Sequence, residues 1–491
     1  MRFNSFEYIF LLAATVGIYY FLPLKLRRVM LLLGSFAFYA GWNAKYLLLM
    51  LAVIFVTYIA AIFIVKYEKY KKAILLTSTV AVFLLLFYFK YLNFAINSIN
   101  AVFNTQLNLL NIVLPVGISF YIFQSVGYVI DVYRNSEICE RNLISYALFI
   151  SFFPQLVAGP IERSKNMLDQ FKIKHKLDLE NIKNGRTLVL IGLVQKVVIA
   201  DRLATFVTNV FDKYQQSSPF TLVVAVIFFA FQVYCDFNAY SMIAIGSAKM
   251  LGFKLMRNFN NPYLSRSFAE YWSRWHISLS TWFQDYIFTP FVWSNPLKKI
   301  SPKFSKPPMR TGLLIVFLVS GFWHGANWTY VIWGLIHAFY RIVGATIAKP
   351  KKKFYKKHKI NRNNPLLIAS DVIIVFALNC FTYIFFRANT ITHALGYIKC
   401  MFINSAAESL AIDAFGLGMG DIILSVILIS TIIVSQIVIE LKYKDKSIEK
   451  IIDEKNAFIQ GVVYAGLFLA IVVLGQYGIN YVENPFIYFQ F

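Results

Sequence analysis

The sequence predicts an all-α, polytopic membrane protein with about eleven transmembrane helices and additional re-entrant segments. Of the 491 residues, 58% are hydrophobic and only 15% are charged, whereas soluble domains carry roughly 25% charged residues. Uncharged runs are long enough to cross a hydrocarbon core, which takes about 20 residues. They cover residues 46–65, 73–89, 91–130, 214–235, 422–439 and 456–482.

Basic residues between the apolar runs predict the orientation of the spans. The segment 349–362, "KPKKKFYKKHKINR", holds eight Lys and Arg, whereas segments 91–112 and 388–420 together hold one, Lys399. Cytoplasmic loops retain Lys and Arg. We therefore expect 349–362 in the cytoplasm and both chain termini outside it. The first apolar run, Tyr8–Leu22, lacks a convincing small-residue cleavage site and is expected to be a span rather than a signal peptide.

Two segments begin and end at basic flanks: 311–340, which is uncharged, and 276–297, in which Asp285 is the one charged residue. One straight helix through either segment would end on the wrong side of the membrane. Two half-helices that meet inside the membrane resolve this conflict, with the first bend near Gly321–Asn327. Irregular backbone at membrane depth is tolerated where it is buried in protein or lines a wet cavity. Both segments therefore predict an internal cavity that opens to the cytoplasm.

The remaining composition excludes several classes of protein. The net charge of +24 arises from short basic clusters between spans, so it indicates topology rather than nucleic-acid binding. The four cysteines show no disulfide or metal spacing, and we expect no metal and no bound cofactor. Neither a repeat nor a soluble domain is evident, so residues 1–491 are predicted to form one membrane domain. Phosphate-loop, serine-hydrolase and zinc-protease motifs are also missing.

Histidine is then the residue type best suited to acid–base chemistry. His324 lies at the predicted bend beside two glycines, and an ionisable residue at membrane depth indicates function by default. His337, 13 residues later, is more simply a packed, neutral side chain. His276 opens the second re-entrant segment, and both interpretations remain open for it.

Asp285 falls in the middle of "WFQDYIF", also at the inferred membrane depth. A buried carboxylate needs a partner to stay ionised, and the candidates are an imidazole across the cavity or Arg274. Asp236 follows Cys235 at the end of a predicted span and could equally lie at the interface.

Three blocks carry a resemblance to a known family: "FFPQLVAGPIERSKNMLDQF" (152–171), "YWSRWHISLSTWFQDYIFTPF" (271–291) and "GFWHGANWTYVIWGLIHAFY" (321–340). They resemble the membrane-bound O-acyltransferase family, and within it the bacterial branch that acetylates polysaccharides outside the cell. The resemblance implies a fold around a central tunnel, with His324 as the essential histidine. Asp285 would match an upstream polar residue of the family, and His276 stands in its W-H-I-S-L-S block. This chain departs from the branch at Gln284, where Arg is frequent, and at Met242, where an acidic residue is frequent.

The last six residues, "FIYFQF" (486–491), resemble the aromatic C-terminal motif of bacterial members or their small partner proteins. The resemblance implies that Tyr488 carries the acyl group transiently. The alternative is an aromatic belt at the outer interface.

These patterns together predict an O-acetyltransferase of the cytoplasmic membrane. Acetyl-CoA would be the donor, His324 the general base, and a periplasmic Ser-His-Asp esterase-like transferase the partner. Peptidoglycan is the first candidate acceptor, alginate or another exopolysaccharide the second, and D-alanylation of teichoic acid the third. A transporter is the alternative of a different class, because transporters also use broken helices at the midplane.

Overall fold

The computed structural model describes residues 1–157, 159–296, 298, 308–403, 412–444, 446–477 and 486–487. Regular structure in these residues is helical throughout, as the sequence predicts. The chain divides into two compact units, residues 1–193 with 239–257 and residues 194–238 with 258–491. We describe each unit by itself.

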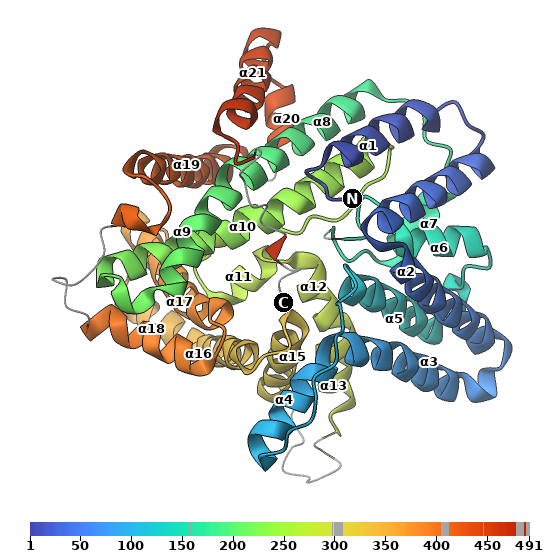
Figure 1. Ribbon diagram of the computed structural model, residues 1–491, viewed down its shortest axis with the longest axis horizontal. Coiled ribbons are helices and arrows are strands. Elements are labelled where there is room, and N and C mark those ends of the chain that lie inside the picture. The colour runs from blue at the N-terminus through green and yellow to red at the C-terminus, as the bar shows by residue number, and fades with distance from the viewer. Residues whose placement is uncertain are drawn as a thin grey trace. The chain divides into compact units, whose positions relative to one another are not determined.

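The first unit contains α1 (Phe6–Tyr19), α2 (Leu24–Lys66), η1 (Glu68–Tyr70), α3 (Lys71–Leu86), η2 (Phe87–Tyr91), α4 (Leu92–Phe103), α5 (Ile118–Arg134), η3 (Ser136–Ile138), α6 (Leu143–Ser151), α7 (Ser164–Phe171) and α8 (Leu179–Leu193). Helix α2 packs against α1, α3, α5 and α6, and Figure 1 shows α2, α3 and α5 side by side. Helix α2 is broken by non-helical backbone at Asn43, just before the uncharged run 46–65.

The second unit contains η4 (Val194–Ala200), α9 (Asp201–Asp212), η5 (Tyr214–Gln216), η6 (Pro262–Leu264), α11 (Phe268–Arg274), α12 (Ile277–Phe283), η7 (Gln284–Phe288), α13 (Thr289–Ser294), α15 (Met309–His324), α16 (Trp328–Lys357), α17 (Pro365–Arg387), α18 (Ile391–Ile403), η10 (Ile412–Phe415), α19 (Met419–Val438), η11 (Ile439–Tyr443), α20 (Ile448–Asp453) and α21 (Ala457–Leu474). Helix α10 (Pro219–Met250) contributes residues to both units. Helix α16 lies between α15 and α17, and α18 packs against α16 and α17 (Figure 1).

Seven helices within the described residues are long and apolar enough to cross a membrane, and three shorter helices are also apolar. The chain is therefore a multi-pass membrane protein, although the predicted number of eleven spans is not confirmed. Small residues allow some of these helices to approach closely. A methyl group on Gly185 of α8 would lie 2.6 Å from the Gly246 carbonyl oxygen of α10. Glycines at such crossings are typical of helix pairs in membranes, where close backbone packing replaces the hydrophobic effect.

The two predicted re-entrant segments differ in the structure. The first breaks where the sequence predicts, because α15 ends at His324 and α16 begins at Trp328. The second is instead one helical run from Ile277 to Ser294, in which a π-helical stretch, η7, replaces the predicted bend. A π-helix absorbs an extra residue without breaking the hydrogen-bonded ladder, so this segment needs no loop.

Candidate active site

His324 is the last residue of α15 and is only 2% exposed. The connection Gly325–Asn327 follows it, and the side chain of Asn327 caps α16 by accepting a hydrogen bond from the Thr329 amide at 3.1 Å. Asn327 also donates from its side chain to the Asn389 carbonyl oxygen at 2.8 Å. Two hydrogen bonds of the Asn327 side chain thus fix the turn after His324 where it enters α16.

Glycines bring α15 and α16 close enough to enclose this histidine. A methyl group on Gly334 of α16 would lie 2.3 Å from the Phe317 carbonyl oxygen of α15, well inside van der Waals contact. At Gly325 a methyl group would lie 2.1 Å from the Tyr330 ring. The glycines of this block therefore serve both the turn after His324 and the close packing of α15 against α16.

Aromatic rings surround the His324 imidazole. Its ring centroid lies 4.8 Å from that of Trp333, 5.0 Å from that of Trp323 and 5.4 Å from that of Phe386. Rings of this size hold a histidine in one orientation and keep bulk water away from it. Electrostatic interactions with a bound substrate are stronger in such surroundings than in water.

His276 is fully buried at the start of α12, and its backbone has a φ of 43°. A non-glycine residue in this left-handed region is uncommon, and such residues cluster at functional sites. Asn258 holds the conformation: its carbonyl oxygen accepts from the Ile277 amide at 2.9 Å, and its side chain accepts from the Ser278 hydroxyl at 2.6 Å. The structure therefore fixes His276 as firmly as His324.

A single indole connects the two histidines. The Trp323 ring lies 5.8 Å from the His276 ring and 5.0 Å from the His324 ring. Residues nearly fifty positions apart in the sequence thus contact the same side chain. Two buried imidazoles on one aromatic ring form the candidate catalytic centre.

His337 has the packed environment that the sequence favours for it. Its Nε2 lies 3.1 Å from the Thr382 hydroxyl, which itself donates to the Asn379 carbonyl oxygen at 2.7 Å. The hydroxyl proton is thereby used, so His337 donates from Nε2. The His337 ring centroid lies 4.7 Å from that of Trp333 on the same helix and 5.7 Å from that of Phe268 on α11.

The predicted burial of Asp285 is wrong. Asp285 lies on η7 with an exposed side chain, whereas the preceding Trp282 and Phe283 are buried. The proposed partner Arg274 instead pairs with Glu270 and Glu440, at 2.7 Å in each case. The sequence of this segment does not show which face of its helix is buried, and here the carboxylate is exposed. A catalytic role for Asp285 stays a prediction.

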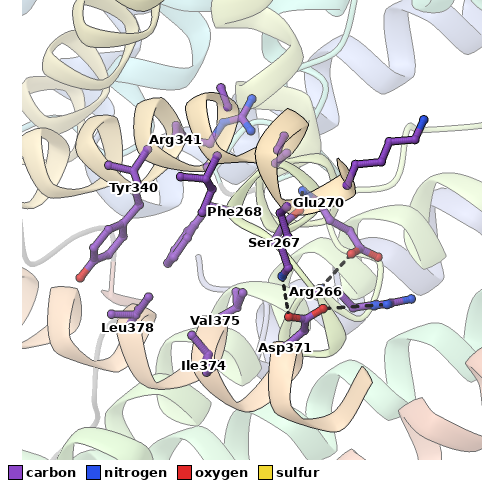
Figure 2. Close-up of a pocket in the computed structure, with 18 of the residues that line it drawn as sticks. Arg266, Ser267, Phe268, Glu270, Tyr340, Arg341, Asp371, Ile374, Val375 and Leu378 are labelled. Atoms are coloured by element: carbon purple, nitrogen blue, oxygen red, sulfur yellow. Dashed lines mark hydrogen bonds and ion pairs between the residues drawn. The ribbon is translucent and has the colours of Figure 1, made fainter. Parts of the chain in front are cut away.

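A cavity of about 780 Å³ lies among α11, α16 and α17 (Figure 2). Phe268 and Tyr340 form part of one wall, with ring centroids 4.6 Å apart, and apolar residues of α17 line the opposite side. Five cationic side chains and two carboxylates also line it: Arg266, Arg341, Lys351, Lys352, Arg362, Glu270 and Asp371. The cavity therefore combines an apolar interior with an excess of positive charge.

A buried charge cluster escaped the sequence analysis. Lys196 of η4 lies 2.8 Å from Asp201 and 2.9 Å from Asp236, and all three side chains are at most 5% exposed. The Ile487 amide donates to the other carboxylate oxygen of Asp236 at 2.8 Å. Asp236 is thus buried within the second unit. Tyr488, the predicted acyl carrier, lies outside the described residues.

Comparison with known proteins identifies the family. The model of the membrane-bound O-acyltransferase family matches residues 34–386. The chain belongs to this family. It is accordingly an O-acyltransferase, and the resemblance of the three sequence blocks is confirmed.

Several curated proteins are similar to this acyltransferase in sequence. A protein of Azotobacter vinelandii named "Probable alginate O-acetylase AlgI" is 38% identical over 69% of this chain and 67% of its own. The "Peptidoglycan O-acetyltransferase" of Helicobacter pylori is 33% identical over 76% of this chain and 73% of its own. The "Teichoic acid D-alanyltransferase" of Bacillus subtilis is 29% identical over 58% of this chain and 71% of its own.

Proposed function

We propose that this acyltransferase moves acetyl groups from cytoplasmic acetyl-CoA across the membrane to an extracytoplasmic polysaccharide. The observation that carries the proposal is His324, a buried imidazole fixed at a glycine-lined break between two apolar helices. The names of relatives at 33–38% identity support acetyl transfer to a polysaccharide. The enzyme would lie in the cytoplasmic membrane with both termini outside the cytoplasm.

His324 acts as the general base in this proposal. Its imidazole accepts the proton of an acceptor hydroxyl, whose oxygen attacks the thioester carbonyl carbon. The carbon–sulfur bond then breaks, and the imidazolium returns the proton to the departing thiolate as free CoA is released. General base catalysis of this kind contributes about 10²- to 10⁴-fold. His276, on the far side of Trp323, is the second imidazole available to orient the reacting groups.

The cavity among α11, α16 and α17 supports a cytoplasmic entry for the donor. Its seven charged lining residues carry a formal charge of +3, which suits the phosphates of CoA. Lys351 and Lys352 belong to the basic segment 349–362 that the loop charges predict to be cytoplasmic. From the cavity wall at Phe268, ring contacts continue through His337 and Trp333 to His324.

Tyr488 is the proposed acyl carrier between this donor and the outer face. An uncharged phenol is a weak nucleophile, because its pKa is ordinarily about 10, so it needs a base such as His324. A periplasmic esterase-like partner with a Ser-His-Asp triad would take the acetyl group from the tyrosine ester and pass it to the sugar.

Peptidoglycan remains the first candidate acceptor and alginate the second. The direct test incubates purified enzyme and partner with labelled acetyl-CoA and either polymer, and measures label in the polymer and free CoA. We expect label in peptidoglycan. Label only in alginate would replace the acceptor but keep the reaction. Release of no CoA with either polymer, together with D-alanyl transfer from a charged carrier protein, would overturn the proposed function.

A further inference from the structure

The cluster of Lys196, Asp201 and Asp236 lies in the protein interior, with Asp236 near the middle of the apolar helix α10. Two carboxylates and one ammonium group leave a formal charge of −1. A buried net charge is costly unless further hydrogen bonds stabilise it, and charged residues within a span indicate function by default. The surplus carboxylate oxygen on Asp236 therefore needs a donor.

The C-terminal segment supplies that donor. The Ile487 amide donates to Asp236 at 2.8 Å, and Ile487 and the preceding Phe486 are both buried, with exposed fractions of 2% and 1%. Phe486 also packs on Phe237, with ring centroids 5.7 Å apart. Consecutive residues of α10 thus hold consecutive residues of the C-terminal segment, one by charge and the other by an aromatic contact.

The π-helix η4 holds the same part of the chain at a second point. Val197, adjacent to Lys196, accepts a hydrogen bond through its carbonyl oxygen from the Gln476 amide at 2.8 Å. Gln476 lies two residues beyond the end of α21. Two described parts of the C-terminal region, Gln476 and Phe486–Ile487, therefore contact the region around Lys196.

Ring contacts lead from this anchor to the catalytic histidines. Phe237 lies 4.5 Å from His276, and His276 shares Trp323 with His324.

We propose that Asp236, paired with Lys196, is a positioning residue that docks Phe486 and Ile487 beside the histidine pair and so serves the acylation of Tyr488. This inference rests on the proposed relay through Tyr488. Asp236 touches no reacting atom; it acts through the Ile487 amide. Release of this contact would free the tyrosine without altering donor binding.

The test measures docking and catalysis separately, in the full-length protein. Ile487→Cys is labelled with a maleimide in detergent, with the parent protein giving the background from the native cysteines. We expect slow labelling, and at least a ten-fold faster rate when Asp236→Leu is added. Asp201→Asn is the matched control: like Asp236→Leu it leaves Lys196 with one carboxylate, but it keeps the Ile487 contact, so labelling should stay slow.

In the transfer assay, Asp236→Leu should lower kcat at least ten-fold and leave the KM for acetyl-CoA within two-fold, and Asp236→Glu should restore part of the rate. Unchanged labelling in Asp236→Leu would overturn the docking contact. Faster labelling with a normal kcat would overturn the positioning role. Failure of the relay itself has a different signature, since Tyr488→Phe would then transfer acetyl normally while position 487 stayed protected.

Discussion

At the scale of single residues, the sequence indicates the candidate site at His324, where an ionisable side chain, a turn and small residues occur together. Gly321, His324 and Gly325 stand together because the helix must end, the imidazole must be enclosed and α16 must approach. His276 has a left-handed backbone conformation, which no sequence motif predicts. In the candidate catalytic centre, the backbone at both His324 and His276 is thus held in a defined conformation.

Replacing Tyr488 by Phe tests the relay at this scale. The change keeps the aromatic ring but removes the phenolic oxygen, so acetylation of the polymer should fall to background while the protein level stays unchanged. With labelled acetyl-CoA, the wild-type C-terminal peptide should carry a base-labile label and the variant peptide none. Near-normal polymer acetylation would return Tyr488 to an interfacial aromatic belt.

At the scale of helices, the α15–α16 pair determines whether His324 is enclosed. Gly334→Ala places a methyl group 2.3 Å from the Phe317 carbonyl oxygen, and the helices must separate to admit it. Overpacking of this kind costs about 1–3 kcal/mol. We therefore expect a lower thermal midpoint in detergent and a reduced transfer rate.

Gly344→Ala on the same helix is the control, because no atom lies within 4 Å of the added methyl group. Its stability should change by no more than about 1 kcal/mol, in the direction of helix propensity. Equal midpoints for the two variants would show that close packing at Gly334 does not hold the pair together.

The cavity lining gives a second prediction for α16. Arg341→Gln combined with Lys352→Gln removes two of the five cations, and hydrogen bonds to charged groups are worth about 1.5–3 kcal/mol. The KM for acetyl-CoA should rise about ten-fold or more, with a smaller effect on kcat. Lys353→Gln with Lys356→Gln removes the same charge from α16 outside the cavity lining and should leave KM within two-fold. Equal KM values for both pairs would place the donor elsewhere.

At the scale of the whole molecule, the topology can be tested across one helix. Helix α17 has 23 residues and is about 34 Å long, close to the thickness of a hydrocarbon core. Asn363 precedes it and Thr392 follows it, and both are exposed. In intact cells, Thr392→Cys should react with an impermeant maleimide and Asn363→Cys should not. Labelling of Asn363→Cys from outside would reverse the orientation and remove the cytoplasmic entry.

Sequence patterns reveal local features better than contacts between distant segments. Hydropathy and the glycine-rich block predict the helical class and the break after His324, because both depend on neighbouring residues. The exposure of Asp285 was missed because the sequence of its segment does not show which face of the helix is buried. The anchor at Asp236 was missed because its partners, Lys196 and Ile487, come from other parts of the chain.

The central claim, that His324 is the base for acetyl transfer, is tested most directly by His324→Ala in purified enzyme with labelled acetyl-CoA and partner. Removal of a general base usually costs about 10²-fold or more. We expect transfer to fall at least a hundred-fold while the variant inserts normally, elutes as wild type and keeps position 487 protected. A correctly folded variant that retained more than about a tenth of the wild-type rate would contradict the claim.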